Sequence, residues 1–263
     1  MITSNLHTHT LYCDGKDTPE QLVLQAIALG FDTIGFSGHV YTGFDESYCM
    51  SRENTARYKA EIGRLKQTYQ GQIRVLCGIE QDYYAEASTA GYDFVIGSVH
   101  YVHKDGEYIP VDLSAEVLTS AINWHWGGDA YAFVAQYYAL VAGVVHKTGA
   151  DIIGHFDVVT KFNGTLRLFD QTDPRYTRAA LQAADALLAS GKLFEINTGA
   201  MARGLTTEPY PAYWLVDYIH AHGGKLTLSS DCHGRENLAY GFDEVERHMQ
   251  AKGYPLWRFL GRE

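Results

Sequence analysis

Histidines and carboxylates stand at the ends of apolar runs along this chain, beginning with His7-x-His9. In a strand, residues two apart face the same side, so His7 and His9 can reach one metal ion together. Asp14 follows within a Tyr-Cys-Asp-Gly stretch, where a turn would bring its carboxylate over the strand end. Imidazole and carboxylate ligands suit zinc, iron or manganese better than calcium or magnesium. We therefore predict that this segment contributes to a metal site.

Five later apolar runs end in residues of the same types. In chain order these runs lead to His39, Glu80, His100, Gly154-His155-x-Asp157 and Asp231-x-His233. Burying the Glu80 carboxylate is costly unless it is paired or binds a cation. Histidines brought together without a cation would repel one another when protonated, and would leave ring nitrogens unpaired. Each run alone could be structural, but together they predict a metal centre.

Short apolar runs alternate with longer helical stretches, and these elements must position the polar residues. We expect strands over Ser4–Thr8, Thr33–Ser37, Ile73–Ile79, Phe94–Val99, Ile152–Gly154, Leu193–Asn197 and Lys225–Ser229. We expect helices between them, over about Pro19–Leu29, Arg52–Gln70, Ala130–Thr148, Pro174–Ser190 and Tyr210–His222. Thr18-Pro19 and Asp173-Pro174 resemble helix starts, and Gly30 marks a helix end.

This alternation predicts an α/β fold with a parallel sheet and helical crossovers. Seven or so strands in 263 residues favour a closed or nearly closed barrel, whose strand ends converge on one face. A doubly wound open sheet is the alternative, but no Gly-x-Gly-x-x-Gly loop follows the first strand. In the barrel, the polar residues at the strand ends would share the face that carries the chemistry.

Composition restricts the class of protein. With 46% hydrophobic and 20% charged residues, the chain suits one folded domain over residues 1–263. Its net charge of −10, without a Lys/Arg cluster, indicates no nucleic-acid partner. The longest apolar run, near Ala139–Val145, is too short to span a membrane. We expect a cytoplasmic protein, because the first residues lack an export signal and the four cysteines lack the spacing of a disulfide framework.

The ordered set of histidines and carboxylates resembles the PHP (polymerase and histidinol phosphatase) superfamily, and within it the bacterial monofunctional histidinol-phosphate phosphatases. The resemblance runs from residue 7 to residue 233. It implies the PHP fold, a distorted (β/α)7 TIM-like barrel, and a centre of three divalent ions (zinc, manganese or iron). It implies a first ion bound by His7, His9, Glu80 and Asp231, a second bound by Glu80, His100 and His155, and a third bound by Asp14, His39 and His233.

The same resemblance implies contacts with the substrate. Arg203 would hold phosphate through its planar guanidinium, and Lys161 matches a basic position after the Gly-His-x-Asp motif. Either cation could instead be a solvated surface charge. Asp157 would orient a histidine or a substrate amine. We expect a loop around Asn123–Gly128, in a segment that could cover the site and bring His103 or His125 to the substrate.

The resemblance implies a metal-dependent phosphatase that acts on a small phosphate monoester. The substrate would be L-histidinol phosphate, giving L-histidinol and phosphate as in histidine biosynthesis. Glu80 would serve two ions, and Asp231, Asp14 or a metal-bound water would protonate the leaving oxygen. The alternatives are another PHP phosphoesterase acting on nucleotide, phosphotyrosine or other alcohol phosphates, a TIM-barrel amidohydrolase, or a non-enzymatic metal-storing or polymerase-associated module.

Overall fold

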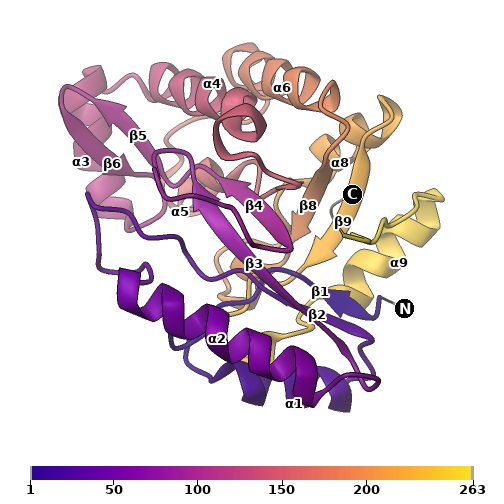
Figure 1. The fold of residues 1–263 in the computed structure, drawn as a ribbon. Helices are drawn as coiled ribbons and strands as arrows, with labels where there is room; N and C mark the ends of the chain where they lie inside the picture. The colour runs from indigo at the N-terminus through magenta and orange to yellow at the C-terminus, as the bar shows by residue number, and fades with distance from the viewer. Residues whose placement is uncertain (1, 262–263) are drawn as a thin grey trace.

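The computed structural model describes residues 2–261, which form an α/β barrel (Figure 1). Seven of its strands make one parallel sheet in the order β1-β2-β3-β4-β7-β8-β9. Their bounds are Ser4–Asn5, Thr33–Phe36, Arg74–Asp82, Phe94–Ser98, Ile152–Ile153, Leu193–Asn197 and Lys225–Ser229. Each predicted strand has its counterpart in this sheet, so the sequence predicted the strands correctly, with small differences at their ends.

The sheet curves into a nearly closed barrel that meets itself beside the first motif. Thr8 and Cys232 form a parallel bridge just beyond the carboxyl ends of β1 and β9. The His9 amide donates to the Cys232 carbonyl at 2.9 Å, and the Cys232 amide donates to the His7 carbonyl at 3.3 Å. The closure confirms the barrel rather than the open sheet, and it joins two of the predicted ligand motifs directly.

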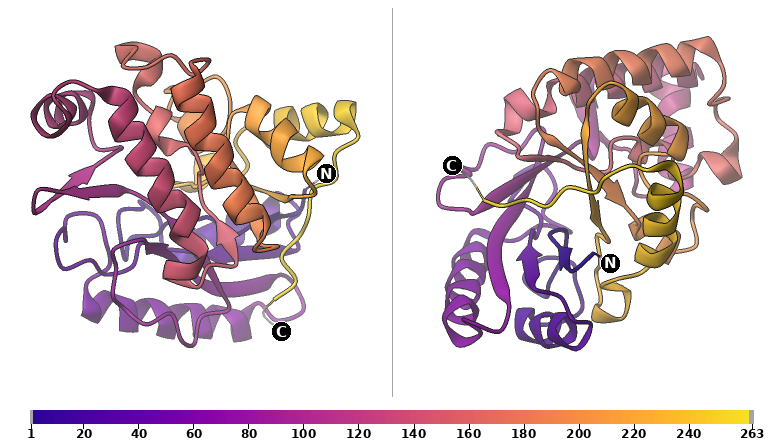
Figure 2. Two further views of the ribbon diagram at one scale, coloured as in Figure 1. Left: turned by 90° about the horizontal axis from the view of Figure 1, so that it is seen from above. Right: turned by 90° about the vertical axis from the view of Figure 1, so that its right-hand side faces the viewer.

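The helices lie on the outside of the barrel (Figure 2). They are α1 (Pro19–Ala28), α2 (Arg52–Thr68), α3 (Ala115–Trp126), α4 (Ala130–Thr148), α5 (Asn163–Leu166), α6 (Pro174–Leu188), α7 (Gly199–Ala202), α8 (Tyr213–Ala221) and α9 (Phe242–Lys252), with short 3-10 turns η1 (Val158–Thr160) and η2 (Arg235–Asn237). The Thr18 hydroxyl accepts from the Gln21 amide, and the Gln21 side chain accepts from the Thr18 amide, so a capping box starts α1. Asp173 caps α6 in the predicted place. None of the described helices is long and apolar enough to cross a bilayer.

The prediction differs from the structure in several places, and it did not include α3, α5 or α7. The helix expected from Tyr210 begins at Tyr213, because Tyr210 pairs with Asn197 as an antiparallel bridge. The expected loop around Asn123–Gly128 is largely the last turn of α3, which ends at Gly127 in the left-handed region (φ 62°). Helix α9 was not expected. Local capping and strand pairing determine where these segments begin and end, and the spacing of apolar residues alone does not predict them.

The other difference is a hairpin of β5 (Tyr101–Lys104) and β6 (Glu107–Pro110), which projects from the barrel ahead of α3. Its turn is Asp105-Gly106, and both residues have positive φ, at 52° and 86°. Asp-Gly is a strong signal for a two-residue hairpin turn, so this element was detectable in the sequence.

Apolar side chains fill the end of the barrel opposite the carboxyl ends of the strands. Phe94 is fully buried there, and a Cβ on Gly78 would lie 2.3 Å from its ring. Glycine is therefore required at that point of β3 to admit the ring. The surrounding cluster consists of Leu6, Leu76, Ile96, Ile152 and Leu193, with Phe259 packed against it. Phe259 belongs to the C-terminal tail, whose Trp257 amide donates to the Leu226 carbonyl at 2.7 Å, and which crosses the barrel in Figure 2.

Candidate metal centre and active site

The strand ends bring all the predicted ligand side chains to one rim of the barrel. They are His7, His9, Asp14, His39, Glu80, His100, His155, Asp231 and His233, and each lies within 4 Å of another member of the set. The polar positions follow β1, β2, β4, β7 and β9, while Glu80 lies within β3 and pairs with His39 across an isolated bridge. Residues scattered over the whole sequence thus meet because parallel strands end together.

The first group joins His7, His9, Glu80 and Asp231. Glu80 Oε2 lies 3.3 Å from His7 Nε2 and 3.6 Å from His9 Nε2. Asp231 Oδ1 lies 3.6 Å from His7 Nε2 and 3.1 Å from His9 Nε2. Atoms bound tetrahedrally to zinc at about 2.0–2.2 Å are separated by about 3.3–3.6 Å. His7, His9 and Glu80 offer ligand atoms that all lie within 4.8 Å of one another, which fits a single metal ion, and Asp231 contacts both histidines.

The opposite oxygen of Glu80 faces a second group. Glu80 Oε1 lies 3.0 Å from His155 Nε2 and 3.3 Å from His100 Nε2. The Ser98 hydroxyl donates to the same oxygen at 2.6 Å and fixes the carboxylate. Glu80 Oε2 also lies 2.9 Å from His39 Nδ1. The two oxygens of Glu80 therefore face different sets of histidines, and its carboxylate stands between the groups of ligand atoms.

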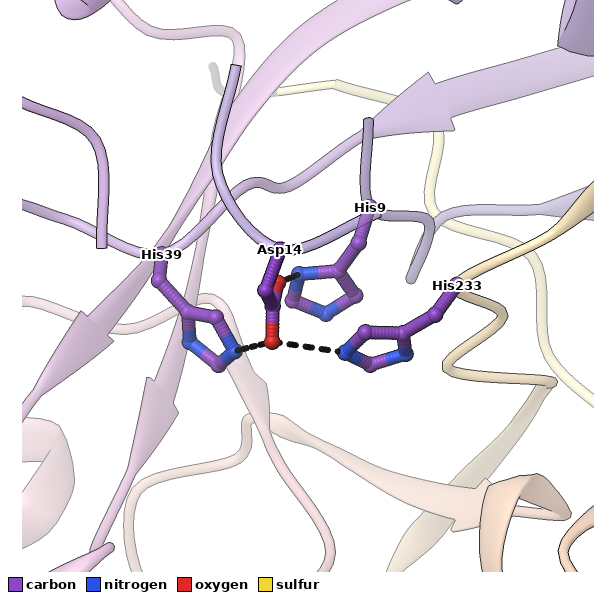
Figure 3. A group of neighbouring side chains, drawn as sticks. All are labelled: His9, Asp14, His39 and His233. Atoms are coloured by element: carbon purple, nitrogen blue, oxygen red, sulfur yellow. Dashed lines mark hydrogen bonds and ion pairs between the residues drawn. The ribbon is translucent and has the colours of Figure 1, made fainter. Parts of the chain in front are cut away.

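A third group surrounds Asp14 (Figure 3). Asp14 Oδ2 lies 3.1 Å from His233 Nε2 and 3.6 Å from His39 Nε2, while Oδ1 lies 3.5 Å from His9 Nδ1. The rings of His9 and His233 stack with their centroids 4.1 Å apart. His9 thus faces the first group through Nε2 and the third through Nδ1, an arrangement that the sequence did not indicate.

Within residues 2–261, three buried polar atoms of the first group have no hydrogen-bond partner: His7 Nε2, His9 Nε2 and Glu80 Oε2. Buried polar atoms are almost always hydrogen-bonded, so three neighbouring buried atoms without a hydrogen bond need an explanation. A cation bound among them would satisfy all three at once. Together with the spacing, this identifies the rim as a site for divalent metal.

The electrostatics of the rim favour positive charge. Burial opposes protonation of His7, but the carboxylates of Glu195, Asp231 and Glu80 outweigh it and raise the pKa of His7 to about 10. Burial likewise opposes ionisation of Glu80, yet His39, His7 and His100 hold the pKa of its carboxyl well below the usual range. Metal cations would supply the charge that these protons otherwise provide.

Two carboxylates that the sequence did not assign to the site orient its histidines. Glu195 accepts from His7 Nδ1 at 2.5 Å and from the His155 amide at 2.7 Å. Asp82 Oδ2 accepts from the His100 amide at 3.1 Å and lies 3.3 Å from its Nδ1. Such partners fix the ring orientation of metal-binding histidines. Each acid interrupts an apolar strand, and Asp82 lies two residues after Glu80 on the same face, so a signal was present.

The backbone of Asp231 is unusual, because its φ of 47° lies in the left-handed region. Asp is one of the few residues with a side chain that adopt this conformation readily. The left-handed turn follows β9 directly and places the carboxylate between the first group and Arg203, whose Nη2 lies 3.6 Å from Asp231 Oδ2.

A cavity of about 480 Å³ opens over the rim. Most of the predicted ligands line it, and so do Arg203 and Lys161, the two cations expected at the substrate. Lys161 Nζ donates to the carbonyl of Asp112 at 2.7 Å and to its carboxylate at 3.2 Å. Both side chains thus line the same cavity as the predicted ligands.

Other predicted residues lie outside this cavity. Asp157 is fully buried and accepts from the Ala212 amide at 3.0 Å, and burial raises the pKa of its carboxyl to about 7. His103 lies on β5 with its ring 4.6 Å from that of Tyr108, and His125 Nδ1 lies 3.0 Å from Asp105. None of these three side chains is among the residues that line the cavity.

Comparison with known proteins gives a consistent picture. Residues 5–199 match the PHP domain family. A protein of Schizosaccharomyces pombe named "Probable histidinol-phosphatase" is 26% identical over 96% of this chain and 87% of its own length. The histidinol-phosphatase of Bacillus subtilis is also 26% identical, over 90% of this chain and 96% of its own length. A crystal structure of histidinol phosphate phosphatase from Lactococcus lactis, complexed with zinc, L-histidinol and phosphate, shares the fold with a TM-score of 0.71. Its sequence is 20% identical, and the match covers 97% of this chain and 95% of that one.

Proposed function

Because this chain belongs to the PHP domain family, we propose that it is a metal-dependent phosphatase that hydrolyses L-histidinol phosphate to L-histidinol and phosphate. The observation that carries the proposal is a single cavity that combines the ligand groups of the rim with Arg203 and Lys161. A phosphate monoester needs this combination, since its hydrolysis depends on positioning and on neutralising charge. Relatives that match over most of their length and are named for this activity support the choice of substrate.

We assign three divalent ions to the rim, with the ligand sets that the resemblance to the PHP superfamily implies. The support is the clustering of these side chains on the rim, where Glu80 contacts histidines of all three sets and His9 contacts members of two. Nitrogen and oxygen donors suit zinc, manganese or iron. When bound, such ions would generate a nucleophile from water at neutral pH and would offset the charge of the phosphate oxygens.

The remaining steps belong to side chains of this protein. Arg203 and Lys161 bind phosphate oxygens and orient the ester, and Arg203 does so through paired donors. Glu80 holds the first two groups in register, because Ser98 fixes its carboxylate. Asp14 and Asp231 both line the cavity, and either of them or a metal-bound water would protonate the leaving oxygen.

The test is phosphate release by protein whose metal content has been measured. We expect histidinol phosphate to be hydrolysed with a higher kcat/KM than AMP, phosphotyrosine or glycerol phosphate, and a phosphodiester to react poorly. Excess chelator should abolish the activity, and added zinc or manganese should restore it. A higher kcat/KM for another monoester would transfer the proposal to that substrate, and no turnover of any phosphoester by metal-loaded protein would refute it.

A further inference from the structure

One wall of the active-site cavity is formed by a loop over residues 40–50 and by the start of the β5–β6 hairpin. Asp45, Ser47 and Tyr48 from the loop line the cavity together with Tyr101 from β5. The loop leaves the barrel after His39 and returns to it, since the Met50 amide donates to the His39 carbonyl at 3.1 Å. Tyr101 directly follows His100. The wall is therefore attached at both ends to predicted metal ligands.

The Asp45 carboxylate is held in this wall by uncharged donors. The Tyr101 hydroxyl donates to Oδ2 at 2.7 Å. Ser47 donates to Oδ1 through its amide at 3.0 Å and its hydroxyl at 2.6 Å. Within residues 2–261, no Lys, Arg or His side chain forms an ion pair with Asp45. Although burial acts in the opposite direction, these hydrogen bonds lower the pKa of Asp45, so its carboxylate is ionised near neutral pH.

The backbone of Asp45 is fixed as well. Its carbonyl accepts from the Thr42 hydroxyl at 2.6 Å and lies 3.5 Å from Cys49 Sγ. The neighbouring Phe44 ring packs edge-on against Tyr101, with centroids 5.0 Å apart. A side chain anchored through its carboxylate, its carbonyl and its neighbour is preorganised for a ligand, and binding would cost little ordering entropy.

The other carboxylates of the cavity are already neutralised or solvated. Asp112 is paired with Lys161, and Asp14 and Asp231 lie among the histidines of the rim. Glu236 on η2 is exposed, so water screens its charge. Asp45 thus combines a fixed position, a negative charge and the absence of a protein cation.

We propose that Asp45 is a specificity-determining residue that binds the positively charged nitrogen group of the substrate while Arg203 and Lys161 hold its phosphate. The inference rests on the proposed function, which supplies a phosphate ester carrying an amine and an imidazole. A carboxylate–ammonium hydrogen bond is charge-assisted, and the rings of Tyr48 and Tyr101 beside it favour a cation further. An ester without a cation gains nothing from this hydrogen bond, which is a basis for discrimination between the two kinds of substrate.

The test compares Asp45→Asn with the wild type on three monoesters. Histidinol phosphate and phosphoethanolamine carry a positive charge, and glycerol phosphate does not. We expect kcat/KM for the two cationic esters to fall roughly ten- to hundredfold, mainly through KM, and kcat/KM for glycerol phosphate to change less than about twofold. Asp45→Glu keeps the charge and should restore part of the loss. Tyr101→Phe removes one anchoring hydroxyl and should shift the same ratio in the same direction by less.

Glu46→Gln is the matched control, because it removes a neighbouring negative charge that does not line the cavity. It should leave all three substrates unchanged. An equal loss on all three esters in Asp45→Asn with normal metal content, or no change in any, would overturn the assignment. The ratio of kcat/KM for phosphoethanolamine to kcat/KM for glycerol phosphate tests Asp45 even if histidinol phosphate proves not to be the best substrate. A failure of the Asp45 assignment can therefore be distinguished from a failure of the proposed function. If Asp45→Asn does not fold, an unchanged ratio in Tyr101→Phe gives the same negative answer.

Discussion

The two ends of the barrel are built from the same strands in opposite ways. At one end, histidines and carboxylates are buried beside one another, and several of their polar atoms have no hydrogen-bond partner in the described part of the chain. At the other, Leu6, Phe94 and their neighbours form a compact apolar cluster. Burying polar and charged groups costs free energy, whereas burying apolar surface supplies about 25 cal/mol per Å². The apolar end therefore stabilises a fold whose opposite end is arranged for metal binding, and the two ends should respond differently to substitution.

The largest effect should come from Glu80→Gln at the polar end. The amide keeps the shape but removes the charge shared by two ligand groups, so metal content and activity should fall together. We expect kcat/KM to drop at least about a thousandfold, as much as the loss of a key electrostatic contact in other enzymes. Metal analysis and kinetics on the same preparation check this. Near-native turnover by a metal-depleted Glu80→Gln protein would show that the polar end is not the reactive one.

Phe94→Ala should have the converse effect at the apolar end. Emptying the space between Gly78 and Leu6 should lower the free energy of unfolding by about 3–5 kcal/mol. The kcat of the protein that remains folded should stay within a few-fold of the wild type. Denaturant unfolding and active-site titration measure the two quantities separately. Phe259→Ala, at the same end but only half-buried, should destabilise less. A loss of kcat without a loss of stability would contradict the division between the ends.

Glu195→Gln tests the carboxylate that lies behind the metal ligands and orients His7. This carboxylate touches His7 but does not line the cavity, so its removal should weaken metal binding without blocking the substrate. We expect metal affinity to fall about 10- to 100-fold, measured by competition with a chelating dye. Ser229→Ala removes only the hydroxyl that donates to Glu195 at 2.5 Å and should have a smaller effect. Equal metal affinity in Glu195→Gln and the wild type would show that His7 needs no orienting partner.

Arg203→Ala should give the smallest of these effects. Arg203 stands at the cavity but its side chain is 38% exposed, so the fold does not depend on it. We expect KM for histidinol phosphate to rise about tenfold with metal content unchanged. Arg203→Lys keeps the charge but not the planar pair of donors, so its KM should lie between those of the wild type and Arg203→Ala. An unchanged KM in Arg203→Ala would remove this residue from the phosphate site.

The polar end was the easier of the two to predict from the sequence. A histidine such as His100 or His155 closing an apolar run is visible without a structure, and parallel strands then require these residues to meet. Phe94 and Gly78 look like ordinary strand residues, because their contact depends on barrel curvature. Asp45 could not be predicted either. Its proposed role depends on hydrogen bonds from Ser47 and from Tyr101, and Tyr101 is distant in sequence and lies on the hairpin.

The left-handed turn at Asp231 restricts which residues can replace it during evolution. Aspartate, asparagine and glycine accept that backbone conformation, while a branched residue would be strained there by roughly 1–2 kcal/mol. A descendant that had lost all catalysis would therefore still favour one of these three residues. Retention of asparagine or glycine at this place would mark an inherited bend in the chain, and only the carboxylate itself would mark surviving chemistry.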